Sequence, residues 1–185
     1  MGSSDKAVNV SRVFGLLRQN FLGFFSQLIR SNSSSEAYAA IRGQVGFGNF
    51  LAYQVLVDLL YPSSRDGGKP LLPFSHDDWA AAGPGAQRGI EVLCPDHTAP
   101  DLEVMRWLRW NQRAEFARLG LSFPFVQDAN GREVEISLAN IQNCLCEFYK
   151  YTKIKEGRGR GRRLFRPRPW EKVRQSTLIP FFQAE

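Results

Sequence analysis

The chain has 185 residues, of which 43% are hydrophobic and 23% charged, and its formal net charge is +6. This composition is typical of a single globular domain and excludes a wholly disordered chain. No apolar stretch is long enough to span a bilayer, and the N-terminus lacks the pattern of a secretory signal. The three cysteines, Cys94, Cys144 and Cys146, do not form a disulfide framework. We therefore expect the protein to reside in a reducing compartment and to bind no membrane. We also expect it to be a monomer.

The positive charge is concentrated in one segment. Between Lys150 and Arg174 there are eleven Lys and Arg residues and two acids, a balance of +9, whereas the rest of the chain has a balance of −3. A basic block beside a near-neutral body favours a polyanionic partner, most often nucleic acid. The alternative is a tail that serves solubility or nuclear import.

The predicted elements are almost all helical. Apolar residues recur at three- and four-residue steps, as they do on one face of a helix. The pattern predicts helices over 9–30, 34–42 after the start signal Ser33-x-x-Glu36, 49–60, a short one near 76–79 after Ser75, and 86–93, 100–119 and 137–154. No segment alternates as a strand does. We expect an all-α fold of six or seven helices.

The order along the chain predicts four parts. Residues 1–8 are expected to be disordered or a remnant of an expression tag, and residues 9–156 to form the helical domain. Residues 157–174 are rich in Gly, Arg and Pro, which is typical of an extended arm. Residues 175–182 form a separate peptide motif.

That motif reads Gln175-Ser176-Thr177-Leu178-Ile179-Pro180-Phe181-Phe182. It is similar to the PCNA-interacting peptide (PIP box) of eukaryotic replication and repair proteins, Gln-x-x-aliphatic-x-x-aromatic-aromatic. A single 3₁₀ turn places Leu178, Phe181 and Phe182 on one side as an apolar plug, and Gln175 supplies an oriented amide. The motif predicts binding to the PCNA sliding clamp and a nuclear location. The alternative is that these residues complete the core of the helical domain.

A second motif, Gly83-Pro84-Gly85, stands just before a predicted helix. Glycines let the backbone approach a phosphate, and the helix N-terminus offers free N–H groups. Gln87 and Arg88 lie in the first turn, where Arg88 adds charge. We therefore predict DNA contacts by two groups of residues: Gly83, Gly85, Gln87 and Arg88 at the turn, and Arg158, Arg160, Arg162 and Arg163 in the arm. The alternative is an ordinary loop.

Several segments together resemble one family. They are Gly46-Phe-Gly48-Asn-Phe50, Gln54-Val-Leu-Val-Asp58, Asp78-Trp79, Ala82-Gly-Pro-Gly85-Ala-Gln-Arg88-Gly89, Asn143-Cys-Leu-Cys146-Glu147 and Gly161-Arg-Arg163. They resemble the helical domain found with 5-hydroxymethyl-deoxyuridine DNA kinases, also described as α-glutamyl/putrescinyl-thymine pyrophosphorylases or amino acid:DNA transferases. The resemblance covers about residues 35–168. It implies a fold like that of the helix-hairpin-helix DNA glycosylases, with a DNA-binding function that acts on or recognises a modified pyrimidine.

The resemblance and the helical spacing suggest site residues. Asp101 lies near the place of the glycosylases' catalytic aspartate, and Asp58 and Glu147 are the other candidate catalytic acids. Gln54, Asn143 and Lys150 are candidates to line a base pocket, since amides read the edge of a flipped base. Alternatively, Asp101 is a first-turn acid that the helix dipole favours, and Glu147 and Lys150 form a surface pair. Gln87 stands where amine-nucleophile glycosylases have lysine, which argues against a Schiff-base lyase.

Two classes of function follow. The first is a clamp-recruited DNA enzyme, a base-modifying transferase or a glycosylase-like enzyme. The second is a non-enzymatic DNA-binding adaptor of replication or repair, which is favoured if Asp58, Asp101 and Glu147 are solvated or paired. The chain has no phosphate-binding Gly-x-x-x-x-Gly-Lys-Ser/Thr loop, which excludes kinase activity within it. We expect no metal site and no cofactor.

Overall fold

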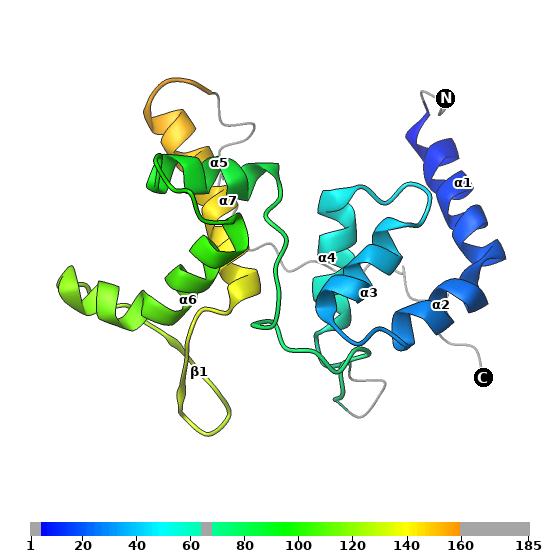
Figure 1. The fold of residues 1–185 in the computed structure, drawn as a ribbon, viewed down its shortest axis with the longest axis horizontal. Coiled ribbons are helices and arrows are strands. Elements are labelled where there is room, and N and C mark those ends of the chain that lie inside the picture. The colour runs from blue at the N-terminus through cyan, green and yellow to red at the C-terminus, as the bar shows by residue number, and fades with distance from the viewer. Residues whose placement is uncertain (1–4, 64–67, 160–185) are drawn as a thin grey trace, which may run out of the picture. The chain divides into compact units, whose positions relative to one another are not determined.

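A computed structural model of the chain describes residues 5–63 and 68–159 (Figure 1). The chain divides into two units after Thr152, and each is described by itself. The described residues form seven helices and one hairpin, which confirms the predicted all-α class. The elements are α1 (Lys6–Gln19), α2 (Phe21–Ile29), α3 (Ser34–Arg42), α4 (Asn49–Leu59), α5 (Pro84–Leu93), α6 (Asp101–Arg118), β1 (Val126–Gln127), β2 (Glu133–Val134) and α7 (Leu138–Lys155).

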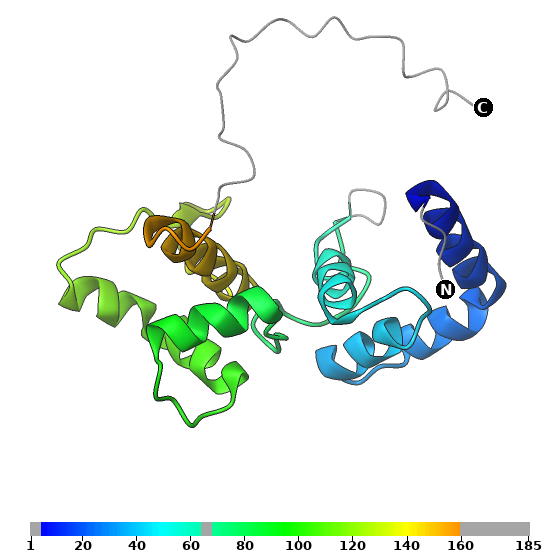
Figure 2. The same ribbon diagram turned by 90° about the horizontal axis from the view of Figure 1, so that it is seen from above.

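The first predicted helix is in fact two helices. The chain bends at Asn20, whose φ of −103° and ψ of 10° leave the helical region, and Figures 1 and 2 both show α1 at an angle to α2. Asn is a poor residue for a helix interior because its side chain competes for backbone hydrogen bonds. Helix α1 has no buried residue, whereas α2 buries Leu28 against the core. The continuous helix predicted over 9–30 was therefore wrong at this position.

The start of α3 is as predicted. The Ser33 hydroxyl accepts a hydrogen bond from the Glu36 N–H at 3.2 Å, and the Glu36 carboxylate accepts one from the Asn32 N–H at 2.8 Å. The first bond satisfies one of the donors that a helix start leaves free, and the second fixes the residue before the N-cap Ser33.

One local prediction was wrong, and one small element was not predicted. The segment after Ser75 is a turn rather than a helix, in which the Ser75 hydroxyl accepts from the Asp77 N–H and Asp78 accepts from the Ser75 N–H. Residues 126–134, where no strand was predicted, form a small antiparallel hairpin with Val126 opposite Val134. Its strands are two residues long and exposed, so they show no alternation of apolar and polar residues.

One hydrophobic core joins α2 to α7 of the first unit. Its fully buried side chains come from distant parts of the chain: Ile41, Leu56, Ile90, Met105 and Leu138. None of the described helices is long and apolar enough to cross a bilayer.

Helix α5 lies very close to α7. A Cβ added to Gly85 would lie 2.4 Å from the Cys146 Sγ, and one added to Gly89 would lie 2.3 Å from the Leu145 carbonyl oxygen. Both distances are far below van der Waals contact. Only glycine therefore permits the two helices to approach in this way.

Of the second unit, residues 153–159 are described. Gly157 has a φ of +71°, a conformation that glycine adopts readily, and it ends α7. The Arg158 N–H donates to the Lys153 carbonyl at 2.9 Å, which closes the last turn.

Candidate functional site

A small cavity of about 40 Å³ lies where α3, α4, the segment before α5 and α7 meet. Its lining combines aromatic, amide and small side chains: Tyr38, Asn49, Phe50, Tyr53, Ala81, Ala82, Gly83 and Gln142. No carboxylate and no cation belongs to this lining. We refer to it as the tyrosine–glutamine cavity.

Local structure explains how these residues meet. Gly48 precedes α4 in an extended conformation, which places Asn49 and Phe50 in its first turn and Tyr53 one turn later. The rings of Tyr38 and Tyr53 both pack on Trp79, with centroid distances of 5.0 and 6.0 Å. These aromatic contacts hold the two tyrosines in place.

Two of the residues that line the cavity, Tyr53 and Gln142, each carry a buried polar atom without a partner. Tyr53 and Gln142 are each 2% exposed, and the Tyr53 hydroxyl and the Gln142 side-chain carbonyl find no hydrogen-bond partner among the described residues. Burial raises the pKa of Tyr53, so its hydroxyl remains a neutral donor at physiological pH. An unpaired buried polar group costs about 1–3 kcal/mol. A polar ligand atom or a water in this cavity would recover part of that cost.

The cavity has a defined capacity. A water occupies about 10–15 Å³ by this measure, so 40 Å³ holds a group of about two or three heavy atoms and not a whole nucleobase. Phe50 lines the cavity and is also 57% exposed, so its ring joins the cavity to the surface. The arrangement suits a ligand that inserts a small polar substituent while its body stays outside.

The three predicted catalytic acids lie elsewhere. Asp58 is exposed on α4. Asp101 accepts a hydrogen bond from the Gln87 amide at 3.2 Å. Glu147 pairs with Lys150 at 2.5 Å, and their side chains are 70% and 58% exposed. Among the described residues, the structure brings no two of these acids together in a cavity.

The predicted pocket residues are neighbours of the residues that line the cavity. Gln54 follows Tyr53, and Asn143 follows Gln142. Neither Gln54 nor Asn143 lines the cavity, and Asn143 is exposed. One residue is a rotation of about 100° on a helix. The sequence signal for the residues that line this cavity is a polar group on the apolar face of a helix. Gln142 shares the buried face of α7 with Leu138 and Leu145.

The predicted phosphate contacts at the α5 turn have other partners. Gly85 faces Cys146 on α7, Gln87 donates to Asp101, and Arg88 pairs with Glu91 at 2.9 Å. Gly83 is buried, and no side chain caps this helix start. The packing accounts for the glycines without a phosphate, so these DNA contacts stay predictions.

The basic arm and the clamp motif lie almost wholly outside the described residues. This holds for Arg160, Arg162, Arg163, Gln175, Leu178, Phe181 and Phe182. Arg158 is described, and its guanidinium pairs with Glu156 at 2.6 Å.

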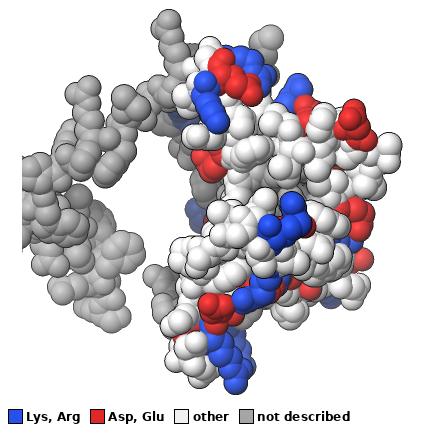
Figure 3. Space-filling view, turned by 90° about the vertical axis from the view of Figure 1, so that its left-hand side faces the viewer, with Lys and Arg blue, Asp and Glu red and all other residues white. Residues whose placement is uncertain are grey.

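The arginines of α6 are neutralised by carboxylates. Arg106 pairs with Glu103, Arg118 with Glu115, and Arg113 with both Glu133 and Glu135. Figure 3 shows a face on which blue and red groups lie side by side between broad white areas. This pattern is typical of paired surface charges rather than of a basic stripe for DNA. Within residues 5–63 and 68–159, no group of three or more His, Cys, Asp or Glu is placed to hold a metal ion.

The fold and the cavity together define an all-α domain with a small buried polar site. The family model described as "5-hmdU DNA kinase, helical domain" matches residues 3–161. The chain belongs to this family, and it is therefore related to DNA modification. A curated relative, the 5-hmdU DNA kinase of Bacillus phage SP10, is 27% identical over 121 residues, which is 65% of this chain and 18% of the relative. The chain thus spans less than a fifth of that relative. No solved structure matches it.

Proposed function

We propose that this chain is a DNA-binding domain that recognises a modified pyrimidine in DNA and carries out no chemistry on it. Membership of the 5-hmdU DNA kinase family supports the choice of DNA and of a modified base. The observation that carries the proposal is the tyrosine–glutamine cavity, because two of its lining residues, Tyr53 and Gln142, each carry a buried polar atom without a partner.

The cavity suits the substituent that distinguishes such a base from thymine. A hydroxymethyl group has two heavy atoms, and its hydroxyl both donates and accepts a hydrogen bond. The Tyr53 hydroxyl is available as a donor and the Gln142 carbonyl as an acceptor. The exposed side of Phe50 offers a surface on which the base can stack, a contact worth about 1–3 kcal/mol. A thymine methyl group would leave both polar atoms unpaired.

The lining also argues against an enzyme. A general acid or base must lie within hydrogen-bond reach of the reacting atom. Among the described residues that line the cavity, the titratable ones are Tyr38 and Tyr53, and burial holds Tyr53 neutral. The phage relative is named as a kinase, but this chain has no phosphate-binding Gly-x-x-x-x-Gly-Lys-Ser/Thr loop. The proposed role is recognition.

Two further parts of the proposal come from the sequence. The basic segment 157–174 would bind DNA phosphates, and the motif 175–182 would recruit the protein to the PCNA clamp in a nucleus. Of these two segments, only residues 157–159 are among the described residues. If the basic segment binds phosphates, the affinity for DNA should fall steeply with salt concentration, and deletion of residues 157–174 should reduce this dependence.

The test compares two oligonucleotides that differ at one base, thymine or 5-hydroxymethyluracil. Fluorescence anisotropy should show tighter binding to the modified strand. Gln142→Leu keeps the volume but removes the acceptor, so it should abolish the preference and leave thymine binding unchanged. Asn143→Leu, its exposed neighbour, is the matched control and should retain the preference. Equal affinity of the wild-type protein for both strands would refute recognition by the cavity.

A second readout separates recognition from catalysis. The same modified DNA is incubated with the protein, digested to nucleosides and analysed by mass spectrometry. The proposal expects an unchanged set of nucleosides. A new or missing modified nucleoside would establish the enzymatic alternative.

A further inference from the structure

Helix α2 borders two adjoining depressions of about 550 and 570 Å³. Gly23 and Gln27 line both, so the two form one continuous groove along this helix. We call it the elbow groove, since it begins at the bend between α1 and α2. Arg18 lies at one end and Arg30 at the other. Helix α2 has nine residues and is about 13 Å long.

The cations of this groove differ from those of α6. Arg18 and Arg30 have no ion pair with any residue in the described part of the chain, and the same holds for Arg12 and Arg42 on the neighbouring helices. By contrast, Arg106, Arg109, Arg113 and Arg118 are all paired. Unpaired guanidinium groups are available to an anionic partner.

The charge of the surrounding sequence agrees with this contrast. Residues 5–44 hold five basic and two acidic residues, whereas residues 45–152 hold nine basic and thirteen acidic ones. Glu36 is the acid that lines the groove, and its carboxylate already accepts the Asn32 N–H at 2.8 Å. The N-terminal helices are therefore the positive region of the first unit.

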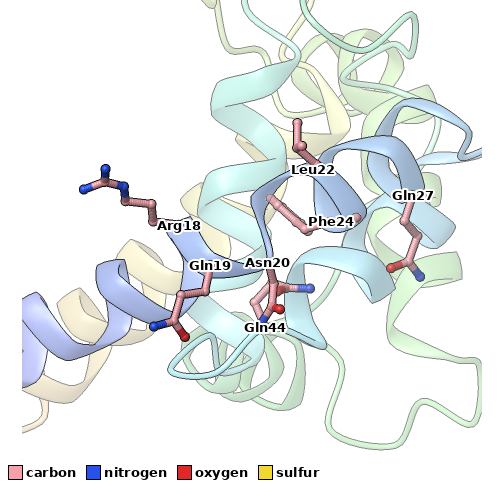
Figure 4. A pocket seen from close by; sticks show the side chains of 8 residues that line it. Arg18, Gln19, Asn20, Leu22, Phe24, Gln27 and Gln44 are labelled. Carbon is pink, nitrogen blue, oxygen red and sulfur yellow. The ribbon is translucent and has the colours of Figure 1, made fainter.

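Carboxamides line the groove between the two arginines. Figure 4 shows Asn20 and Gln44 close together at the bend, with Gln19 and Gln27 on either side of them and Phe24 in the groove. The Gln44 amide donates to the Ala40 carbonyl at 3.2 Å. Amides both donate and accept, so they contact phosphate oxygens and base edges alike. Gly23 leaves the groove open, because a Cβ added there meets no atom within 4 Å.

We infer that the elbow groove binds the sugar–phosphate backbone of a DNA strand. This inference rests on the proposed function, since it adds a backbone contact for the same DNA that the cavity would read. Phosphate contacts position a protein without sequence preference. The groove should therefore contribute equally to binding of modified and unmodified strands.

The test uses the open position Gly23. Gly23→Glu and Gly23→Lys both replace a helix-interior glycine by a better helix former, so neither is expected to unfold α2. Binding to an unmodified thymine oligonucleotide should weaken about three- to tenfold for Gly23→Glu and tighten for Gly23→Lys, with both effects vanishing at high salt. Ala114→Glu, an exposed position on α6, is the control for a charge change alone and should have little effect.

A second variant tests the arginines. Arg18→Gln with Arg30→Gln should reduce the slope of log affinity against log salt by about two. If the Gly23 pair shows no opposite effects and the slope is unchanged, the groove binds no DNA. That result is distinct from failure of the proposed function, which would leave these effects intact but abolish the preference for 5-hydroxymethyluracil. A wild-type protein that binds no DNA at all would overturn both.

Discussion

The carboxylate of Asp77 accepts a hydrogen bond from the backbone N–H of Leu138 at 2.7 Å, although 61 positions separate them in the chain. Leu138 opens α7, so Asp77 satisfies one of the donors that a helix start leaves free. Arg109 of α6 holds the same carboxylate with two hydrogen bonds of 2.8 and 3.1 Å. This contact ties the segment before α5 to α6 and α7, and thereby orients Gln142 one turn further along α7.

Replacing Asp77 by alanine should destabilise the protein. The change removes a remote helix cap and leaves Arg109 with Glu135 as its remaining carboxylate partner. We expect the free energy of unfolding to fall by about 1–2 kcal/mol, measured by urea denaturation. Asp58→Ala, at an exposed position of α4, should change it by less than about 0.5 kcal/mol. Equal effects of the two variants would show that the Asp77 contacts do not stabilise the fold.

Stability should also depend on pH through Asp77. Burial alone would raise the pKa of this carboxyl group, but hydrogen bonds from Arg109 and the Leu138 N–H lower it below its ordinary value of 3.8. The folded state thus favours the ionised form, so the contribution is complete above about pH 5 and is lost as the pH falls below 4. Glu135 should contribute to the pH dependence of stability in the same direction, since hydrogen bonds from Arg109 and Arg113 lower its pKa below 4.5.

The measurement is urea denaturation between pH 7 and pH 2.5. The difference in unfolding free energy between wild type and Asp77→Asn should be constant from pH 7 to pH 5 and shrink below pH 4. A difference that stays constant down to pH 2.5 would contradict a lowered pKa in the folded state.

Much of the fold could be predicted because its helices bury one face. The apolar period in 49–60 and 137–154 reflects the buried sides of α4 and α7. The bend at Asn20 could not be predicted from that period, because the apolar residues of α1 continue the pattern although none of them is buried. The hairpin at 126–134 is too short and too exposed to show a period of its own.

The lining of the cavity could not be predicted from the sequence. Spacing placed Gln54 and Asn143 on two of the helices that border it, but which face of each helix lines the cavity depends on how α3, α4 and α7 meet, which is a tertiary property. The cavity instead takes Tyr53 and Gln142. Likewise, Gly85 suggested close approach of a ligand, and the structure shows close approach of a helix.

Alanine substitutions at two helical glycines, Gly89 and Gly23, should change the stability of the protein in opposite directions. Gly89→Ala forces a Cβ against the backbone of α7, which cannot yield as a flexible side chain does, so it should destabilise by about 1–3 kcal/mol or more. Gly23→Ala meets open space and removes the entropic penalty of glycine, so it should stabilise by about 0.5–1 kcal/mol. Thermal and urea denaturation of the pair provide the test. A neutral Gly89→Ala would mean that α5 is less close to α7 than described.

The motif at residues 175–182 leads to the last prediction. A peptide of residues 170–185 should bind PCNA with an affinity that depends steeply on Leu178, Phe181 and Phe182, because apolar anchors in one pocket carry most of such binding energy. Ser176 and Thr177 stand at the variable positions of the motif, so alanine there should have little effect. Calorimetry with the synthetic peptide measures both.

The full chain provides the control for this motif. Phe181→Ala with Phe182→Ala should abolish clamp binding and leave DNA affinity intact, because neither the basic segment 157–174 nor the elbow groove is altered. The unfolding free energy of the double variant distinguishes the clamp motif from the alternative in which these aromatics complete the helical core. Loss of two core rings would cost about 3–5 kcal/mol each, whereas loss of a docking peptide costs almost nothing. A peptide that releases no heat with PCNA, combined with a double variant of reduced stability, would assign these residues to the core.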